Sequence, residues 1–266
     1  GSDLWLFRGA PAGWGGADAP SCRHLECSYQ PHILTASLGR SMLAAVSSHA
    51  SAATATAGAW TAEQSIYRTR AWIDTAVVRL GLCPYAAKPF HGDRIRYAVS
   101  DCTSDEALVA SFFEEGLLLL DSPEEELATT MLIAPKYEGG IGEFYSLYEW
   151  LTDLLESEEE EVLANGVQPA FFHPAWSFDG LPADSPIHFE KRAPCPVINL
   201  LRRSTLDRTV EEGLRRGVIV NQQISEHNAA ALQAEGTPAL SRLFDDLGAL
   251  QLHTAADEGG ADSGPR

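Results

Sequence analysis

The chain has 266 residues, of which 45% are apolar and 21% charged, values that are typical of a folded globular protein rather than a disordered one. No apolar run approaches the roughly 20 residues that a membrane-spanning helix needs, which excludes a membrane span. Nineteen basic against 37 acidic residues give a formal charge of −18, and so acidic a surface repels phosphate backbones. We therefore expect no nucleic-acid partner.

The N-terminal 59 residues differ from the rest of the chain. Residues 32–59 contain no acid and a single base, Arg40, among many Ala, Ser and Thr residues, which resembles an organelle transit peptide. This pattern predicts a plastid or mitochondrial location, with a cytoplasmic location as the alternative. A flexible low-complexity extension fits equally well, and Trp5, Trp14 and Tyr29 suggest an arm that docks on protein partners. We divide the chain into this extension (1–59), a single α/β domain (60–253) and a flexible tail (254–266).

The predicted domain begins near Trp60 with a helix that Pro84 ends. Its apolar stripe consists of Ile66, Ile73, Val77 and Leu80. Three short apolar segments, 95–100, 129–134 and 167–172, are typical of strands, and two helical patterns separate them. The order β-α-β-α-β, with crossovers long enough for parallel pairing, predicts an α/β fold with a small sheet of about three strands and flanking N- and C-terminal helices.

The sequence also contains signals for helix starts and one strongly acidic region. Thr103 and Glu106 have the spacing of a capping box, Pro196 is placed for a first helical turn, and Thr237-Pro238 starts the last helix. Residues 104–161 carry seventeen acids and one base, a net of −16, and end in a glutamate run. The simplest interpretation of that run is a solvated helix end or loop; a surface for a basic protein or a divalent ion is the alternative.

The five cysteines are odd in number and do not suggest a disulfide scaffold. Cys83, Cys102 and Cys195 lie in or beside apolar segments, and we expect them to be reduced. Cys22 and Cys27 lie five residues apart, and they form either a local disulfide or one half of a metal site. No second such pair completes a zinc tetrahedron, so we predict no metal.

Four sequence segments carry a family resemblance. These are LGLCPY (80–85), FHP (172–174), KRAPCP (191–196) and NLLR (199–202). They resemble the motifs LNLCPF, FHP, NRSPYP and HLLR of an uncharacterised family, domain of unknown function 1415, over about 72–210. The resemblance implies no known activity. Gly81, Asn199 and Arg203 stand where that family favours asparagine, histidine and an acid, and these losses speak against catalysis.

Two residues of these motifs are candidate catalytic groups. His173 closes an apolar strand, where α/β proteins usually place ligands, and an imidazole there suits general acid–base work or metal binding. A histidine whose bonds are satisfied by backbone is the alternative. Cys83 lies at the predicted end of the first helix, where the dipole raises a thiol pKa, unless Arg94 or Arg96 supplies a nearby cation. A buried structural cysteine is the alternative for Cys83.

Arg192 precedes two prolines that stiffen the approach to a predicted helix N-terminus. The Arg192 guanidinium and the free N–H groups of that N-terminus together predict an anion site. We assign substrate binding to Arg192, Asn199, Arg202 and Trp176, with structural salt bridges as the alternative for the arginines. His173, His188 and Glu190 have the composition of a two-histidine, one-carboxylate metal set, but short loops produce such triplets often.

No GxGxxG, Walker A, GxSxG or HExxH motif is present, which speaks against the common nucleotide-binding and hydrolase classes and leaves the cofactor unknown. Two functions remain. The first is a small-molecule protein that binds an anionic ligand near His173, Arg192 and Cys83, with acid–base chemistry there; whether the chain is an enzyme stays open. The second is a non-catalytic accessory subunit of an organellar complex, bound through residues 1–59 and the acidic surface.

Overall fold

The computed structural model describes residues 60–156 and 161–251. Residues 1–59, 157–160 and 252–266 lie outside this part. The predicted transit-like extension, the docking arm, the Cys22–Cys27 alternatives, most of the glutamate run and the flexible tail therefore fall outside the described residues.

The first helix begins at Ala62, close to the predicted start near Trp60, changes its winding, and ends at Val78 rather than at Pro84. In α1 (Ala62–Trp72) the Thr61 hydroxyl accepts the N–H of Gln64 at 3.2 Å, and the Gln64 side chain accepts the N–H of Thr61 at 3.0 Å, which forms a capping box. The helix then widens into the π-helix η2 (Ile73–Val78). A π segment often marks a functional site, because its looser turn displaces side chains from regular helical positions. A turn at Gly81 leads to the short helix α2 (Ala87–His91).

The sheet confirms the three predicted strands and adds a fourth. Strands β1 (Ile95–Val99), β2 (Thr129–Ile133) and β3 (Val167–Phe172) agree with the prediction to within one residue at each end. The helix predicted to run from Pro196 to Gly217 is wrong in its first part, because this segment is strand β4 (Val197–Arg202), and the helix begins only at Arg203. All six of its residues are buried, and a segment buried on both faces lacks the polar side that separates a strand from a helix in sequence.

The strand order is β1-β2-β4-β3, so β4 lies between β2 and β3. β1 and β2 are parallel, while β4 is antiparallel to both of its neighbours. The three predicted strands therefore run in one direction, and the unpredicted one runs in the opposite direction between them. The α/β fold class is confirmed.

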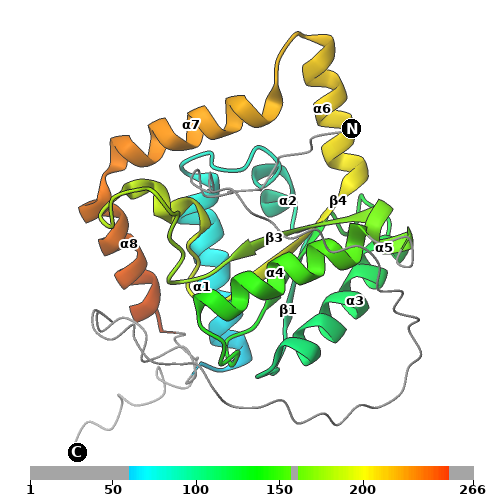
Figure 1. The fold of residues 1–266 in the computed structure, drawn as a ribbon, viewed down its shortest axis with the longest axis horizontal. Helices are drawn as coiled ribbons and strands as arrows, with labels where there is room; N and C mark the ends of the chain where they lie inside the picture. The colour runs from blue at the N-terminus through cyan, green and yellow to red at the C-terminus, as the bar shows by residue number, and fades with distance from the viewer. Residues whose placement is uncertain (1–59, 157–160, 252–266) are drawn as a thin grey trace, which may run out of the picture.

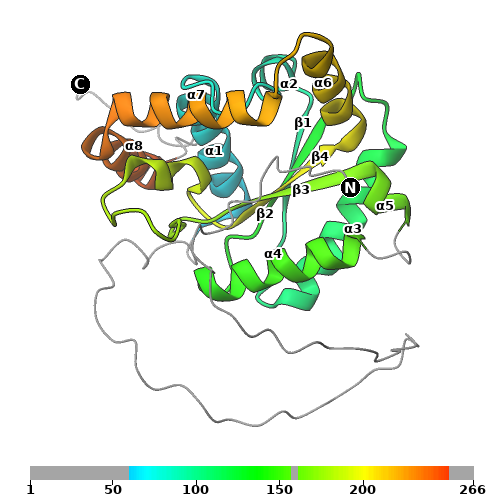
Figure 2. The same ribbon diagram turned by 45° about the horizontal axis from the view of Figure 1, so that its top comes forward.

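Helices cover both faces of the sheet, as Figures 1 and 2 show. One face carries α3 (Asp105–Asp121), α4 (Ile141–Glu156) and α5 (Glu161–Gly166), whose apolar side chains form the larger core. The opposite face carries α1, η2 and α8 (Thr237–Ala249). The 3₁₀-helix η4 (Pro186–Lys191), α6 (Arg203–Arg215) and α7 (Val220–Glu235) complete the domain.

Two further sequence expectations meet the structure in these helices. The last helix begins at Thr237 with Pro238 in its first turn, as predicted. The capping box at Thr103 does not form, because α3 takes Ser104 as its N-cap and no side chain caps it. Within 60–156 and 161–251, no helix combines the length and the apolar character that crossing a membrane requires.

Candidate functional site

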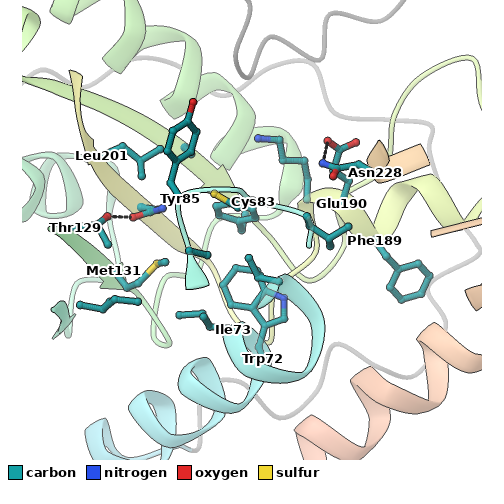
Figure 3. Close-up of a pocket in the computed structure, with 18 residues that line it drawn as sticks. Trp72, Ile73, Cys83, Tyr85, Thr129, Met131, Phe189, Glu190, Leu201 and Asn228 are labelled. Carbon is teal, nitrogen blue, oxygen red and sulfur yellow. Dashed lines mark hydrogen bonds between the residues drawn. The ribbon is translucent and has the colours of Figure 1, made fainter. Parts of the chain in front are cut away.

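A cavity of ≈ 50 Å³ lies between the sheet and the π-helix, and we call it the inner cavity. Its floor is the sheet face that carries Ile95, Met131, Asn199 and Ala170, one residue from each of the four strands. Its other walls come from η2, the 82–86 loop, η4 and α7. In the view of Figure 3, Trp72 and Ile73 lie below the cavity, and Phe189 and Asn228 lie to its right. All four of the resembling motifs contribute side chains to this cavity, at Cys83, Phe172, Lys191 and Asn199.

Asn199 lies in the middle of the floor because β4 pairs it with Met131 of β2 and Ala170 of β3. The Thr129 hydroxyl lies 2.6 Å from Oδ1 of Asn199 (Figure 3) and 2.7 Å from the carbonyl oxygen of Leu200, and these two acceptors share its single proton. This contact fixes the amide so that Oδ1 is engaged, and it leaves the Nδ2 group as the donor that Asn199 offers to the cavity.

Cys83 projects into the inner cavity from the loop between η2 and α2 (Figure 3). Burial raises the pKa of its thiol, while the backbone N–H groups of Tyr85 and Ala86 and the charge of Lys191 lower the pKa. The predicted cations are elsewhere: Arg96 pairs with Glu115 at 2.7 Å, and Arg94 lines a different hollow. Lys191, which the sequence did not single out, is the cation that acts on this thiol.

Lys191 ends η4, and its ammonium is buried in the lining of the inner cavity with only 5% of the residue exposed. Its Nζ lies 5.1 Å from the centroid of the Phe172 ring, a cation–π distance. Burial lowers the pKa of Lys191 from 10.5 to about 8, against the raising effect of Glu190 and Cys83. An ammonium with this pKa holds and releases a proton close to neutral pH.

Asn228 of α7 adds a buried polar atom that has no protein partner within the described residues. Its Nδ2 donates to Oε1 of Glu190 at 3.0 Å (Figure 3), whereas its Oδ1 is buried without a hydrogen bond. A buried acceptor left unpaired costs about 1–3 kcal/mol, so this oxygen calls for a donor from a bound molecule or water. No signal in the sequence points to Asn228, because it lies in a helix with no motif.

His173, Trp176 and Arg192 are not part of the inner-cavity lining and form a separate group at the end of β3. The Arg192 Nε donates to the carbonyl oxygen of Trp176 at 3.0 Å. The backbone N–H of Trp176 donates to the carbonyl oxygen of His173 at 3.1 Å. The Arg192 guanidinium also lies 4.5 Å from the Phe189 ring centroid. The structure therefore brings these three predicted residues together, but apart from Cys83 and Asn199.

The His173 imidazole is buried against Phe144, with ring centroids 5.4 Å apart, and its Nδ1 accepts the N–H of Ala175 at 3.1 Å. Burial lowers the pKa of His173 from 6.5 to about 4, so the ring is neutral at physiological pH. The predicted helix N-terminus beside Arg192 does not exist, because β4 follows Pro196. Burial also lowers the pKa of the Arg192 guanidinium.

His188 and Glu190 are both engaged within the fold. The Nδ1 of His188 accepts the N–H of Phe178 at 3.1 Å, and Nε2 lies 2.8 Å from the carbonyl oxygen of Pro182. Because both ring nitrogens have partners, His188 offers no lone pair to a metal. No group of three His, Cys, Asp or Glu residues with metal-site geometry occurs among the described residues.

Arg202 is buried and binds backbone. Its guanidinium donates to the carbonyl oxygens of Leu119, Ser122 and Leu127, which ties the end of α3 to β4. One side of Arg202 lines a second, larger hollow of ≈ 210 Å³, which we call the outer hollow. Tyr85, Thr129 and Leu201 line both spaces, so the two are neighbours.

The three departures from the motifs acquire structural meanings. Gly81 has a φ of +67°, a left-handed conformation that asparagine tolerates better than most residues, so glycine and asparagine serve the same turn. Asn199 replaces histidine on the floor of the inner cavity, which removes an acid–base group but keeps a polar one. Arg203 begins α6 at the end of β4.

Comparison with known proteins finds one family. No curated protein and no solved structure matches the chain. A family model described as "Protein of unknown function (DUF1415)" matches residues 64–242, which include all the motifs above and every residue of the inner cavity. Since this match covers more than half of the 266 residues, the chain belongs to the DUF1415 family.

Proposed function

We propose that the inner cavity binds a small, mostly apolar molecule that carries an anionic group, and that the Lys191 ammonium faces this group beside the Cys83 thiol. The observation that carries the proposal is the convergence of Cys83, Lys191 and Asn199, from three distant motifs, on one cavity. The surrounding walls are largely apolar, with Trp72, Met131 and Phe172 among them, which favours a ligand with an apolar body.

Charge is the reason to expect an anion. The Lys191 ammonium already interacts with the charges of Glu190 and Cys83, which raise its pKa, and the anion of a ligand adds a further favourable charge in this buried place. Asn199 Nδ2 adds a donor, and the unpaired Oδ1 of Asn228 takes a hydroxyl or amine hydrogen of the same ligand. A ligand with an anion and a neighbouring hydrogen-bond donor satisfies all of these groups.

Lys191 also supplies acid–base chemistry in this proposal. With a pKa of about 8, its ammonium gives a proton to a ligand atom that becomes basic during a reaction and recovers one from solvent. This role replaces the one first considered for His173, whose pKa of about 4 and buried position make it a poor proton donor at neutral pH. His173 instead positions Lys191, since its backbone N–H donates to the Lys191 carbonyl oxygen at 3.0 Å.

The test is the charge preference of Cys83 alkylation in the full chain. Iodoacetate and iodoacetamide both react with the thiolate and release iodide, but only iodoacetate is an anion. We expect Lys191→Met to lower the ratio of the iodoacetate rate to the iodoacetamide rate at Cys83 by about 10-fold, because a nearby cation is lost. Peptide mass spectrometry separates Cys83 from the other cysteines.

Three controls accompany this measurement. Lys191→Arg keeps the charge and should keep the ratio, and Lys136→Met removes an exposed lysine that pairs with Asp101 at 2.9 Å and should change nothing. In the wild type the preference should fall as the pH rises through about 8, where Lys191 loses its charge. Equal ratios in the wild type and Lys191→Met would contradict an anion-binding cavity.

A further inference from the structure

The outer hollow concentrates positive charge on a strongly acidic chain. Its walls carry Lys88, Arg94, Arg202 and Arg208 with one carboxylate, Glu124, which leaves a formal charge of +3 there. The whole chain carries −18. Four cations around one hollow attract anions to it, although the chain as a whole is acidic.

These four cations come from separate parts of the chain and are held in different ways. Lys88 is on α2 and exposed, Arg94 precedes β1, Arg202 ends β4 and Arg208 is on α6. The Arg94 Nη1 donates to the backbone carbonyl oxygen of Glu124 at 3.3 Å, and Arg202 also binds carbonyl oxygens. Carbonyl partners orient a guanidinium but do not neutralise its charge.

Glu124 is hydrogen-bonded to Arg208, and its charge, like that of Glu125, also acts on Arg202. Its carboxylate accepts two hydrogen bonds from Arg208, at 2.6 and 3.2 Å, and one from the Thr205 hydroxyl at 3.0 Å. These bonds hold the pKa of Glu124 below its usual value and fix the wall formed by α6. The charges of Lys88, Arg94 and Arg202 have no carboxylate hydrogen-bonded to them among the described residues.

We infer that the outer hollow is a binding site for the phosphate group of a small phosphorylated molecule. A phosphate dianion matches several converging cations better than a monoanion does, because it accepts hydrogen bonds from more than one direction. Lys88 and Arg94 supply the charge, and Arg202 forms the base of the hollow. The volume of ≈ 210 Å³ exceeds what a phosphate ion occupies and leaves room for the ester that carries it.

This inference goes beyond the proposed function and does not depend on it. The inner cavity takes an anion through Lys191, whereas the outer hollow uses Lys88, Arg94 and Arg202, which do not line the inner cavity. The two sites share only the walls formed by Tyr85, Thr129 and Leu201. A failure of the alkylation test at Cys83 therefore leaves the outer hollow untouched, and the reverse also holds.

Calorimetric titration of the full chain with inorganic phosphate, glycerol 1-phosphate and acetate tests the inference. We expect saturable binding of both phosphate probes and none of acetate. Tighter binding of inorganic phosphate identifies a site for the free ion, and tighter binding of glycerol 1-phosphate identifies a site for an ester. Lys88→Glu should weaken phosphate binding by about 10-fold or more, since an exposed cation at the hollow becomes an anion.

Lys136→Glu is the matched control, because it makes the same charge change on an exposed lysine outside the hollow and should leave phosphate affinity within twofold. Three results would overturn the inference. These are no saturable binding of either phosphate probe, acetate binding as tight as phosphate, or equal losses in Lys88→Glu and Lys136→Glu.

Discussion

The side chain of His173 illustrates how one residue in a motif can hold structure rather than perform chemistry. It ends β3, its ring is buried against Phe144, and its Nδ1 and its backbone N–H are both hydrogen-bonded. Sequence correctly placed it at a strand end, where a histidine with satisfied bonds and a catalytic histidine look alike. Its neighbour in space, Lys191, shows the reverse case, because a lysine next to an arginine in a motif gives no sign that its charge is buried.

The buried imidazole makes the stability of the protein depend on pH. Between pH 6.5 and about 4 the unfolded chain binds a proton at His173 and the folded chain does not, so the free energy of unfolding falls as the pH falls through this window. The loss from this residue is about 3 kcal/mol at most. We expect His173→Asn, whose side chain also accepts the Ala175 N–H, to lose less stability between pH 7 and 4.5.

Urea unfolding at several pH values measures this difference, and carboxylate protonation affects the wild type and the variant alike. Parallel stability curves for the two proteins would show that the His173 ring is protonated in the folded state.

At the scale of elements, β4 organises the molecule. It separates β2 from β3, contributes Asn199 to the inner cavity, and ends at Arg202, whose guanidinium holds the carbonyl oxygens at the end of α3. Its residues do not alternate between a polar and an apolar face, and Pro196 before it is compatible with the start of a helix or of a strand. The strand is therefore identified by its pairing partners rather than by its own residues.

The contact between Arg202 and α3 predicts a large effect from one substitution. Arg202→Met should lower the free energy of unfolding by about 3 kcal/mol, because several buried carbonyl oxygens lose their donors. Arg208→Met is the matched control: its side chain is 62% exposed, its pair with Glu124 is at the surface, and its loss should cost about 1 kcal/mol or less. Similar losses in chemical denaturation would refute a structural role specific to Arg202.

At the scale of the whole molecule, the two central strands lie between helical layers on both faces, while β1 and β3 are edges. Amide protection follows burial and pairing, so the protein should open first at its periphery. In hydrogen exchange followed by mass spectrometry, we expect peptides of β2 and β4 to exchange most slowly and those of α6 and α2 much faster. Exchange of β4 as fast as that of α6 would contradict the central position of this strand.

The sequence by itself determined the α/β class, the start of the first and last helices, the three strands that run in one direction and the motifs that identify the family. These features depend on local signals, namely capping residues, prolines and apolar periodicity, which act over a few neighbouring residues. It also predicted one site shared by separated motifs; Cys83 and Asn199 line the same cavity, whereas His173 and Arg192 do not.

Only the tertiary structure decided which residues complete each site. Lys191 and Asn228 reach the inner cavity because η4 and α7 lie over one sheet face. Lys88, Arg94 and Arg208 line the outer hollow because α2, the residue before β1 and α6 come together there. Burial and electrostatic environment arise from long-range packing, and a residue's own neighbours in sequence do not reveal them. Long-range packing also explains why His173 and Arg192 lie outside both linings, although each is next in sequence to a residue of the inner cavity, Phe172 and Lys191.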